Sequence, residues 1–482
     1  MRLLLLAFLV VAEGLLQTLQ PGVWLPIASI IELTGGNEEK VRMPKRVEVA
    51  GTKFAVWQSS TTKMWSVVED ICPHRKAPLS QGRIAETGNL ECPYHGWQFG
   101  INGSCTLIPQ LDKKFEGNIP SGTSVSSLPI HITGDILFAY VPLPEEDADS
   151  SSYQKTYEKQ KLPDEVLPLL QDVSSITSRV LPYSFDFLIE NFMDPAHIPF
   201  AHHSLQGVRS DGSPIPTKNL YDLDDSSKVG ISFDDVVRGK PRTNAKVEFM
   251  PPCYFTLTVN ERVGLLILCV PVKAGQSRVF VSPSPGRKLP SFIPKWFVHS
   301  FVNSFVDTDI WIADQERYIR KPRNSYLDSP LGSSNEYGKF DYVMPTSSDT
   351  GCRIWRVWFD KHLSKSKVFG ASPGSKLSWD KTTEQEIDRW ESHTKNCECC
   401  RNALENAEKI DKFSILLALI PLAVTPSKYT RSAGILMFLA AKFFSDKVIR
   451  ATKGPSRGER TSAAQFPSKK SFGVKSLQTN SK

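Results

Sequence analysis

Two short segments, each pairing a cysteine with a histidine, constrain the fold of this chain most strongly. The first reads Cys72-Pro-His74 and the second reads Cys92-Pro-Tyr-His95. Both lie in a stretch, at about residues 24–143, where short runs of β-strand composition alternate with turn residues. Two loops that each offer one thiolate and one imidazole match a Rieske-type [2Fe–2S] cluster, in which two Cys bind one iron and two His bind the other.

A Cys₂His₂ zinc site is the alternative for the same four side chains. Zinc fingers keep their two histidines together, whereas here cysteine and histidine alternate within each loop. We therefore predict a [2Fe–2S] cluster bound by Cys72, His74, Cys92 and His95, in an all-β domain over residues 22–145.

A second cluster of polar residues follows in the segment 183–203. Its periodicity is helical up to Pro199, and Asn191, Asp194 and His197 recur at intervals of three, near one face. His202 lies five residues after His197, which is about 140° around an unbroken helix. We expect Pro199 to break the helix and to let His202 return beside His197.

Two histidines and one carboxylate on one face of Fe(II) leave positions free for O₂ and substrate. An isolated histidine is more often a core or surface residue, but here the pattern D-x-x-H-x-x-x-x-H accompanies a Rieske motif. The carboxylate has to come from elsewhere in the chain. An amphipathic stretch at residues 296–318 offers Asp307, Asp309 and Asp314, and spacing alone does not choose among them.

In this order the two clusters resemble those of the Rieske non-haem iron oxygenases. The resemblance is closer to the plant and algal branch that contains pheophorbide a oxygenase, chlorophyllide a oxygenase and the Rieske component of the chloroplast inner-envelope translocon. It covers about residues 24–448 and rests on four stretches: 69–82, 90–99, 108–110 and 190–203. It implies an α+β protein with an all-β Rieske domain, a helix-grip-like catalytic domain over 146–395 and a membrane-associated helical hairpin at its C-terminal end.

The resemblance also assigns roles to single residues. The third iron ligand of the family precedes a Gln-Glu pair, which favours Asp309, ahead of Gln315-Glu316, with Asp307 as runner-up. Asp194, with Asn191 beside it as a second catalytic candidate, takes the place of the family's aspartate between the iron site and the Rieske histidine of the next subunit, here His95. A homotrimer follows from that arrangement.

Three cysteines cluster at Cys397-Glu-Cys399-Cys400, in a predicted linker over residues 396–411. Cys397 and Cys400 fit the C-x-x-C of the same branch, and that spacing permits a reversible dithiol–disulfide pair. Cys399 is an additional, vicinal cysteine that leaves the pairing open. Free thiols in a linker are the alternative.

The two ends of the chain differ from its middle. Residues 1–16 carry one cation and then an apolar run, which favours a cleavable targeting signal over an amphipathic anchor or a wrongly placed start. Two apolar runs around Pro426 predict a membrane-associated hairpin over 412–450, with an ordinary packed hairpin as the alternative. Residues 451–482 have almost no large apolar side chains and are predicted to be a disordered tail.

The net charge of the chain is +7, from 58 basic and 51 acidic residues. The tail from residue 451 holds five Lys, two Arg and one Glu, hence +6, so the remainder is close to neutral at +1. This distribution argues against a nucleic-acid partner and favours anionic lipid headgroups beside the hairpin.

The function expected from the resemblance is a monooxygenase that uses O₂ and electrons from a ferredoxin-like donor to oxygenate a chlorin macrocycle, in the manner of pheophorbide a oxygenase. The alternatives are a chlorophyllide a oxygenase-like activity and a non-catalytic redox sensor or relay of the translocon type. A plastid membrane is the expected location, with an import route that begins at a signal peptide.

Overall fold

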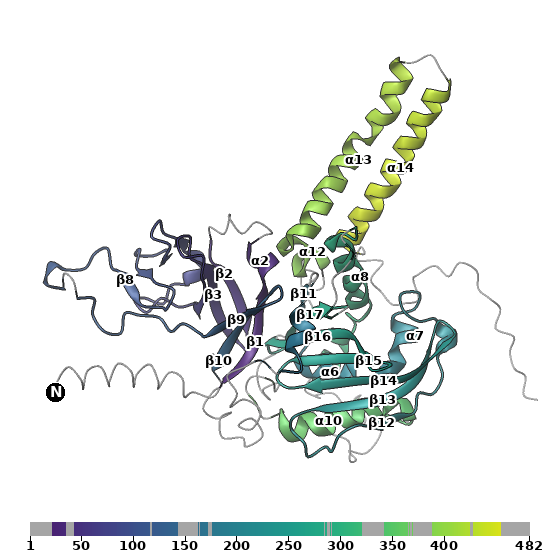
Figure 1. Cartoon of the computed structure of the whole chain (residues 1–482), viewed down its shortest axis with the longest axis horizontal. Coiled ribbons are helices and arrows are strands. Elements are labelled where there is room, and N and C mark those ends of the chain that lie inside the picture. Colours follow the sequence, from purple (N-terminus) through teal and green to yellow (C-terminus); the bar gives the residue numbers. More distant parts are fainter. Residues whose placement is uncertain are drawn as a thin grey trace, which may run out of the picture.

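The computed structural model describes residues 22–34, 43–115, 118–142, 164–171, 176–283, 292–320, 342–364, 388–424 and 428–454, and a few single positions between them. The targeting signal predicted at 1–16 and nearly all of the tail predicted at 451–482 lie outside these residues. The described chain forms an N-terminal β unit, a mixed unit and a long helical hairpin (Figure 1). The mixed unit carries the second predicted cluster and is called the catalytic unit below, after the domain expected there.

The N-terminal unit is built from three antiparallel sheets, ordered β1-β10-β9, β2-β3-β4 and β5-β6-β7-β8. Strand β3 has four successive buried residues, Phe54 to Trp57, because other parts of the unit cover both of its faces. The strands and short helices are β1 (Gly22–Ser29), α2 (Ile30–Thr34), β2 (Lys45–Val49), β3 (Thr52–Gln58), β4 (Trp65–Glu69), η2 (Leu79–Gln81), β5 (Arg83–Ile84), β6 (Leu90–Glu91), β7 (Gln98–Phe99), β8 (Cys105–Leu107), η3 (Lys113–Phe115), β9 (Ile130–Thr133) and β10 (Ile136–Pro142).

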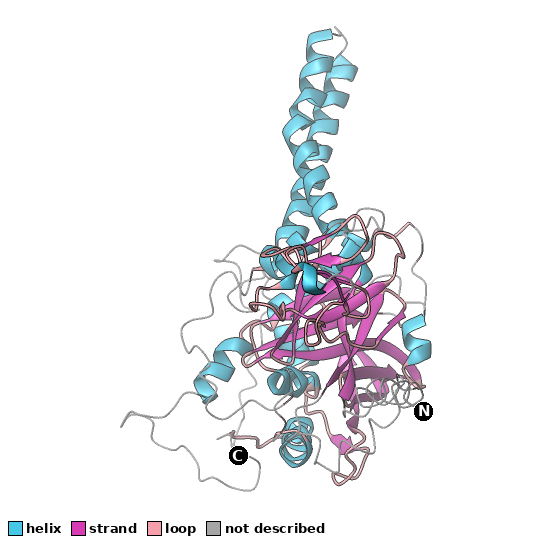
Figure 2. Ribbon diagram, turned by 90° about the vertical axis from the view of Figure 1, so that its left-hand side faces the viewer, coloured by secondary structure: helices cyan, strands magenta, loops and turns pink. Residues whose placement is uncertain are grey.

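The catalytic unit is centred on a seven-stranded antiparallel sheet, ordered β11-β17-β16-β15-β14-β13-β12. Helices pack against it, so the unit has an α+β architecture, as predicted (Figures 1 and 2). The strands are β11 (Thr177–Leu181), β12 (Thr217–Asn219), β13 (Val229–Val237), β14 (Lys240–Met250), β15 (Tyr254–Val259), β16 (Arg262–Lys273) and β17 (Gln276–Ser282). The helices are α5 (Leu167–Gln171), α6 (Phe185–Phe192), η4 (Pro195–His197), α7 (Ile198–Ala201), η5 (Arg209–Asp211), α8 (Lys295–Thr308), α9 (Ile312–Arg320), η6 (Ser347–Asp349) and α10 (Thr350–His362).

The two units are joined by specific contacts. The backbone N–H groups of Ala50 and Gly51, in the turn between β2 and β3, donate to the carbonyls of Pro271 and Val272 at the end of β16, at 2.8 and 2.7 Å. Arg278 on β17 forms an ion pair of 2.8 Å with Glu32 on α2. The N-terminal unit is therefore docked against β16 and β17 of the catalytic sheet.

A buried ion cluster fixes helix α6, which carries Asn191 near its end. The Arg356 guanidinium on α10 pairs with Asp186 at 2.6 Å and also with Glu190, and the Trp355 indole N–H donates to the Asp186 carbonyl at 2.9 Å. These side chains are all buried, and a buried charge is stable only when paired. Helix α10 thus holds α6 in one position.

The predicted helix over residues 183–199 breaks earlier than expected, so the prediction of a break at Pro199 is wrong. Helix α6 ends at Phe192, and Asp194 adopts an extended conformation before Pro195. A residue that precedes proline is disfavoured in the helical conformation, and Pro199 is tolerated because it lies in the first turn of α7. The break after Phe192 still places Asn191 on a different helix from His197 and His202.

The C-terminal elements form a helical hairpin that projects from the body of the molecule (Figures 1 and 2). They are α12 (Arg389–Ser392), η7 (Thr394–Asn396), α13 (Glu398–Val424) and α14 (Lys428–Lys453). Most of the segment predicted as a linker at 396–411 is the first half of α13. Among the described helices, none combines the length and the apolar composition that crossing a membrane requires.

Candidate active site and metal centres

Two loops of the N-terminal unit place the four residues of the first predicted cluster. In each loop the cysteine N–H donates at 2.8 Å to a carbonyl five residues later, that of Ala77 or Trp97. The fourth residue after each cysteine, Lys76 or Gly96, has a positive φ of 60° or 70°, so the two loops share one backbone turn.

The donor set of these loops fits a Rieske cluster. The thiols of Cys72 and Cys92 are buried, whereas His74 is exposed and His95 is half-buried. The two imidazole rings are neighbours, with centroids 4.6 Å apart, and the His74 ring stacks on Trp97. Buried thiolates and outward imidazoles are what a [2Fe–2S] cluster with two Cys and two His requires.

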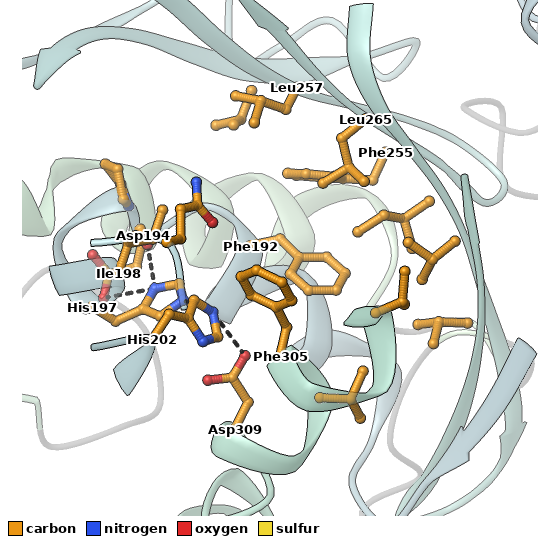
Figure 3. Close-up of a pocket in the computed structure, with 18 of the residues that line it drawn as sticks. Phe192, Asp194, His197, Ile198, His202, Phe255, Leu257, Leu265, Phe305 and Asp309 are labelled. Carbon is orange, nitrogen blue, oxygen red and sulfur yellow. Dashed lines mark hydrogen bonds and ion pairs between the residues drawn. The ribbon is translucent and has the colours of Figure 1, made fainter. Parts of the chain in front are cut away.

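The second site is assembled from α6, η4, α7 and α8, and Figure 3 shows its side chains. His197 lies at the end of η4, His202 follows α7, and Asp309 follows α8. The Nε2 atoms of the two histidines are 3.2 Å apart, and His202 Nε2 lies 3.4 Å from Asp309 Oδ2. The structure thus brings together two imidazoles and a carboxylate, each with a ligand atom within 4.8 Å of the others.

Hydrogen bonds on the far side of each ring define which nitrogen carries the proton. His197 Nδ1 contacts the backbone carbonyl of Asp194, which can only accept. His202 Nδ1 lies 2.8 Å from Thr308 Oγ1, whose own hydroxyl donates to the Phe305 carbonyl at 2.7 Å. Both Nδ1 atoms are therefore protonated, and both Nε2 lone pairs face the gap between the rings.

This arrangement of lone pairs fits a cation between the rings. Two lone pairs 3.2 Å apart repel each other unless a positive charge lies between them, and the Asp309 carboxylate supplies a negative charge beside them. Asp309 Oδ1 is buried and has no hydrogen-bond partner within the described part of the chain. Two imidazoles and one carboxylate are the donor set of non-haem iron sites.

Asn191 and Asp194 lie beside this group. The amide of Asn191 donates to Asp309 Oδ2 at 3.1 Å, so it orients the carboxylate. Asp194 Oδ1 accepts from the N–H of Ala196 at 2.8 Å, and its Oδ2 lies 3.9 Å from His197 Nδ1. The Asp194 carboxylate thus reaches from the His197 ring to the surface, where it is about one-third exposed.

The other two aspartates predicted as candidate ligands have different partners. Asp307 binds Arg179 at 2.7 Å and also Arg389. Burial raises the pKa of the Asp307 carboxyl, but these two guanidinium groups outweigh it and hold the pKa below its usual range. Asp314 is exposed and lies 3.6 Å from Arg317. Neither belongs to the group formed by the histidines.

Burial shifts the ionisation of the site. It raises the pKa of Asp309 to about 6, and burial together with the neighbouring His197 lowers the pKa of His202 to about 3. His202 is therefore neutral and ready to bind a cation at physiological pH, whereas a proton competes for Asp309 in mildly acidic solution.

A cavity of about 480 Å³ opens onto these residues. Its walls are mostly apolar and come from the catalytic sheet, α6 and α8, including Phe192, Phe255, Leu257, Leu265 and Phe305 (Figure 3). The volume lies in the range of small-molecule sites, about 300–1,000 Å³. The site can therefore hold a large apolar ligand next to the two histidines.

A further group lies at the base of the hairpin. Cys397 and Cys400, predicted as a redox pair, meet His299 of α8 and His393, and all four are buried. No sequence motif assigns a role to either histidine. The same holds for Thr308, because a lone threonine before an aspartate carries no signal of its role.

Comparison with known proteins defines the class. Residues 23–129 match the Rieske [2Fe-2S] domain and residues 249–326 match the pheophorbide a oxygenase domain. Pheophorbide a oxygenase of Arabidopsis thaliana is 29% identical over 81% of this chain and 74% of its own length. Protochlorophyllide-dependent translocon component 52 of the same plant is 29% identical over 79% and 72%, and flavonoid 8-hydroxylase 2 of Ocimum basilicum is 28% identical over 88% and 82%.

The chain is therefore a Rieske non-haem iron oxygenase, an oxidoreductase that binds a [2Fe–2S] cluster and a mononuclear iron. Its relatives in this comparison are pheophorbide a oxygenase and other chloroplastic proteins, at 28–29% identity. The predicted resemblance, class of reaction and cofactors are confirmed. The assignment of single residues to the two metals stays a prediction, supported by the geometry above.

The pKa of Asp309 can be measured in iron-depleted protein. We expect the infrared band of a protonated buried carboxyl to grow as the pH falls through about 6, and to be missing in Asp309→Asn. Iron binding should strengthen as the pH rises through the same range, because the proton then leaves. A carboxyl band that titrates near the ordinary aspartate value of about 4 would contradict this account.

Proposed function

We propose that this enzyme inserts one oxygen atom of O₂ into a chlorin macrocycle derived from chlorophyll. The main support is the geometry of one site. There the lone pairs of two imidazoles face each other beside the buried Asp309 carboxylate, at the wall of a large apolar cavity. The names of the relatives support the substrate class, since two of the proteins compared above are named for chlorophyll-related compounds. Their chloroplastic location supports a plastid location for this chain.

In this proposal the mononuclear iron is held by His197, His202 and Asp309, and the [2Fe–2S] cluster by Cys72, His74, Cys92 and His95. When bound, the two centres supply one-electron transfer and O₂ activation. Overall, substrate, O₂, two electrons and two protons give oxygenated substrate and water, and a ferredoxin-like donor provides the electrons. The protein orients the ring by its apolar walls and excludes water from the reacting edge.

An isotope experiment tests the reaction. The purified protein, a ferredoxin and its reductase would be given ¹⁸O₂ with pheophorbide a, chlorophyllide a or a flavone, the last because one relative is a flavonoid hydroxylase. We expect mass spectrometry to find one labelled oxygen in a chlorin. Label in the flavone but in neither chlorin would overturn the proposed substrate, and label in none of the compounds would overturn the proposed reaction.

Asp194 is proposed to link the two metal centres across a subunit boundary. Its carboxylate is about one-third exposed and reaches toward His197 Nδ1, so its outer face is free to accept an N–H from His95 of a neighbouring chain. Burial raises the pKa of Asp194, with the His197 ring opposing that effect. A carboxylate shared by two imidazoles would fix both rings and shorten the electron path in a homotrimer.

Replacing Asp194 by Asn should therefore leave both metal centres in place and slow turnover by about 10–100-fold or more, as for other residues that orient metal ligands. The Rieske absorption spectrum and the trimeric native mass should not change. Asp224→Asn is the matched control, since Asp224 is an exposed partner of Lys361. Normal turnover of Asp194→Asn would exclude the proposed path.

We also propose that the far half of the hairpin contacts a lipid surface. Large apolar side chains are more than one-third exposed on both helices: Phe413, Ile415, Leu416, Leu417, Leu419 and Ile420 on α13, and Ile435, Leu436, Met437, Leu439, Phe443 and Phe444 on α14. A contiguous exposed apolar surface of this kind is typical of an interaction site. Lys447 on α14 suits anionic headgroups at the margin of this surface.

Vesicle flotation tests this contact. The double variant Leu436→Glu/Leu439→Glu should lose binding to galactolipid vesicles that contain anionic phosphatidylglycerol, because each charge has to enter the apolar layer. The double variant Asn402→Glu/Asn406→Glu introduces the same two charges at exposed positions at the base of α13 and should bind like the unaltered protein. Equal binding of both variants would rule out the hairpin surface as the contact.

A further inference from the structure

Four buried side chains from three parts of the chain converge where the hairpin leaves the catalytic unit. His299 lies on α8, His393 follows α12, Cys397 precedes α13, and Cys400 lies in the first turn of α13. Each is at most 4% exposed. Each offers one ligand atom, and the four atoms all lie within 4.8 Å of one another.

The distances in this group match the edges of a small tetrahedron. His299 Nδ1 lies 3.2 Å from Cys397 Sγ and 3.7 Å from Cys400 Sγ, and His393 Nε2 lies 3.4 Å from Cys400 Sγ. With Zn–S bonds of about 2.3 Å and Zn–N bonds of about 2.0–2.1 Å, a tetrahedral site has ligand–ligand distances of about 3.3–3.8 Å. The spacing therefore suits one central ion bound by all four atoms.

The protonation of both rings is compatible with this ion. His393 Nδ1 donates to the backbone carbonyl of Ser178 at 2.7 Å, which leaves the Nε2 lone pair directed at the sulfurs. His299 Nδ1 faces the sulfurs, and its Nε2 has no hydrogen-bond partner within the described part of the chain. The nitrogens that face the thiols are therefore the ligand atoms.

Two other uses of these residues are less well matched. A second Rieske-type [2Fe–2S] cluster would need its two cysteines on one iron and its two histidines on the other. Here the two kinds of ligand are interleaved, since His299 contacts the sulfurs of both Cys397 and Cys400, and the Cys400 sulfur contacts both rings. A disulfide between Cys397 and Cys400, predicted from their spacing, would use neither histidine. A bound metal ion, in contrast, would use both imidazoles and both thiols of this buried group.

We propose that His299, His393, Cys397 and Cys400 bind a single zinc-type divalent cation. Because all four positions of the tetrahedron are filled by the protein, the site is closed and structural, with no position for substrate. The Cys399 sulfur lies 3.3 Å from Cys397 Sγ and 3.5 Å from His299 Nδ1, but Cys399 is outside the group of four whose ligand atoms all lie within 4.8 Å of one another. We therefore do not count it among the four ligands.

The site would fasten the hairpin to the helix that serves the iron site. His299 and Asp309 lie on the same helix and its C-terminal cap, about 15 Å apart at 1.5 Å per residue. The Arg179–Asp307–Arg389 ion cluster joins α8 to β11 and α12. A cation at the base therefore positions α8 as well as α13.

Metal analysis of the full-length protein tests the proposal. After the purified enzyme is washed with a weak chelator, we expect one zinc per chain in addition to its iron. His393→Ala and Cys400→Ser should lower the zinc content about tenfold or more, with no change in the Rieske spectrum. Cys399→Ser is the matched control and should keep its zinc.

Two further measurements keep the test decisive if a variant fails to fold. Protein grown on cobalt should show the visible bands of tetrahedral Co(II) and a thiolate-to-metal charge-transfer band. Alkylation of the native enzyme should find Cys397 and Cys400 reduced but protected until the metal is removed. Absence of zinc, additional iron in its place, zinc loss in Cys399→Ser, or a Cys397–Cys400 disulfide in the native enzyme would each overturn the proposal.

Discussion

The two imidazole nitrogens that face each other 3.2 Å apart are the constraint around which the catalytic unit is arranged. Their lone pairs are directed at one another because a backbone carbonyl and the Thr308 hydroxyl hold the opposite ring nitrogens as donors. Such an arrangement needs a cation, and Asp309 and Asn191 complete its surroundings. The buried Arg356 cluster holds α6, and with it Asn191, at the correct place.

Helix α8 is the element that connects the parts of this molecule. Its C-terminal end supplies Thr308 and Asp309 to the proposed iron site, and Phe301 and Phe305 line the cavity beside it. Asp307 joins it to β11 and α12 through two arginines, and His299 reaches the base of the hairpin. A displacement of the hairpin would therefore act directly on the iron site and its cavity.

The sequence predicted the parts of the protein that depend on local motifs. The two Cys and His loops and the D-x-x-H-x-x-x-x-H pattern could be recognised because each is defined by a short spacing between residues. The order of these motifs along the chain then gave the order of the units. The sequence could not choose between Asp307 and Asp309 by spacing, since both lie near the end of α8; the choice depends on where Arg179 and Arg389 lie in space. Nor could it place the helix break, because the effect of Pro195 on Asp194 outweighed that of Pro199.

The group at the hairpin base shows the same limit more sharply. Cys397 and Cys400 predicted a dithiol, and only the fold brings His299, about a hundred residues earlier in the chain, against their sulfurs. The long helices of the hairpin likewise extend well beyond the two apolar runs, since polar residues such as Asp411, paired with Lys442, continue the helices toward the body.

The most direct test of the central claim is the iron content of anaerobically purified protein, together with that of His202→Ala. A cluster of two irons and one mononuclear iron gives three irons per chain in the unaltered enzyme, and removal of one ligand should leave two with an intact Rieske spectrum. Two irons per chain in the unaltered enzyme would contradict the account and would favour a redox relay without oxygenase activity.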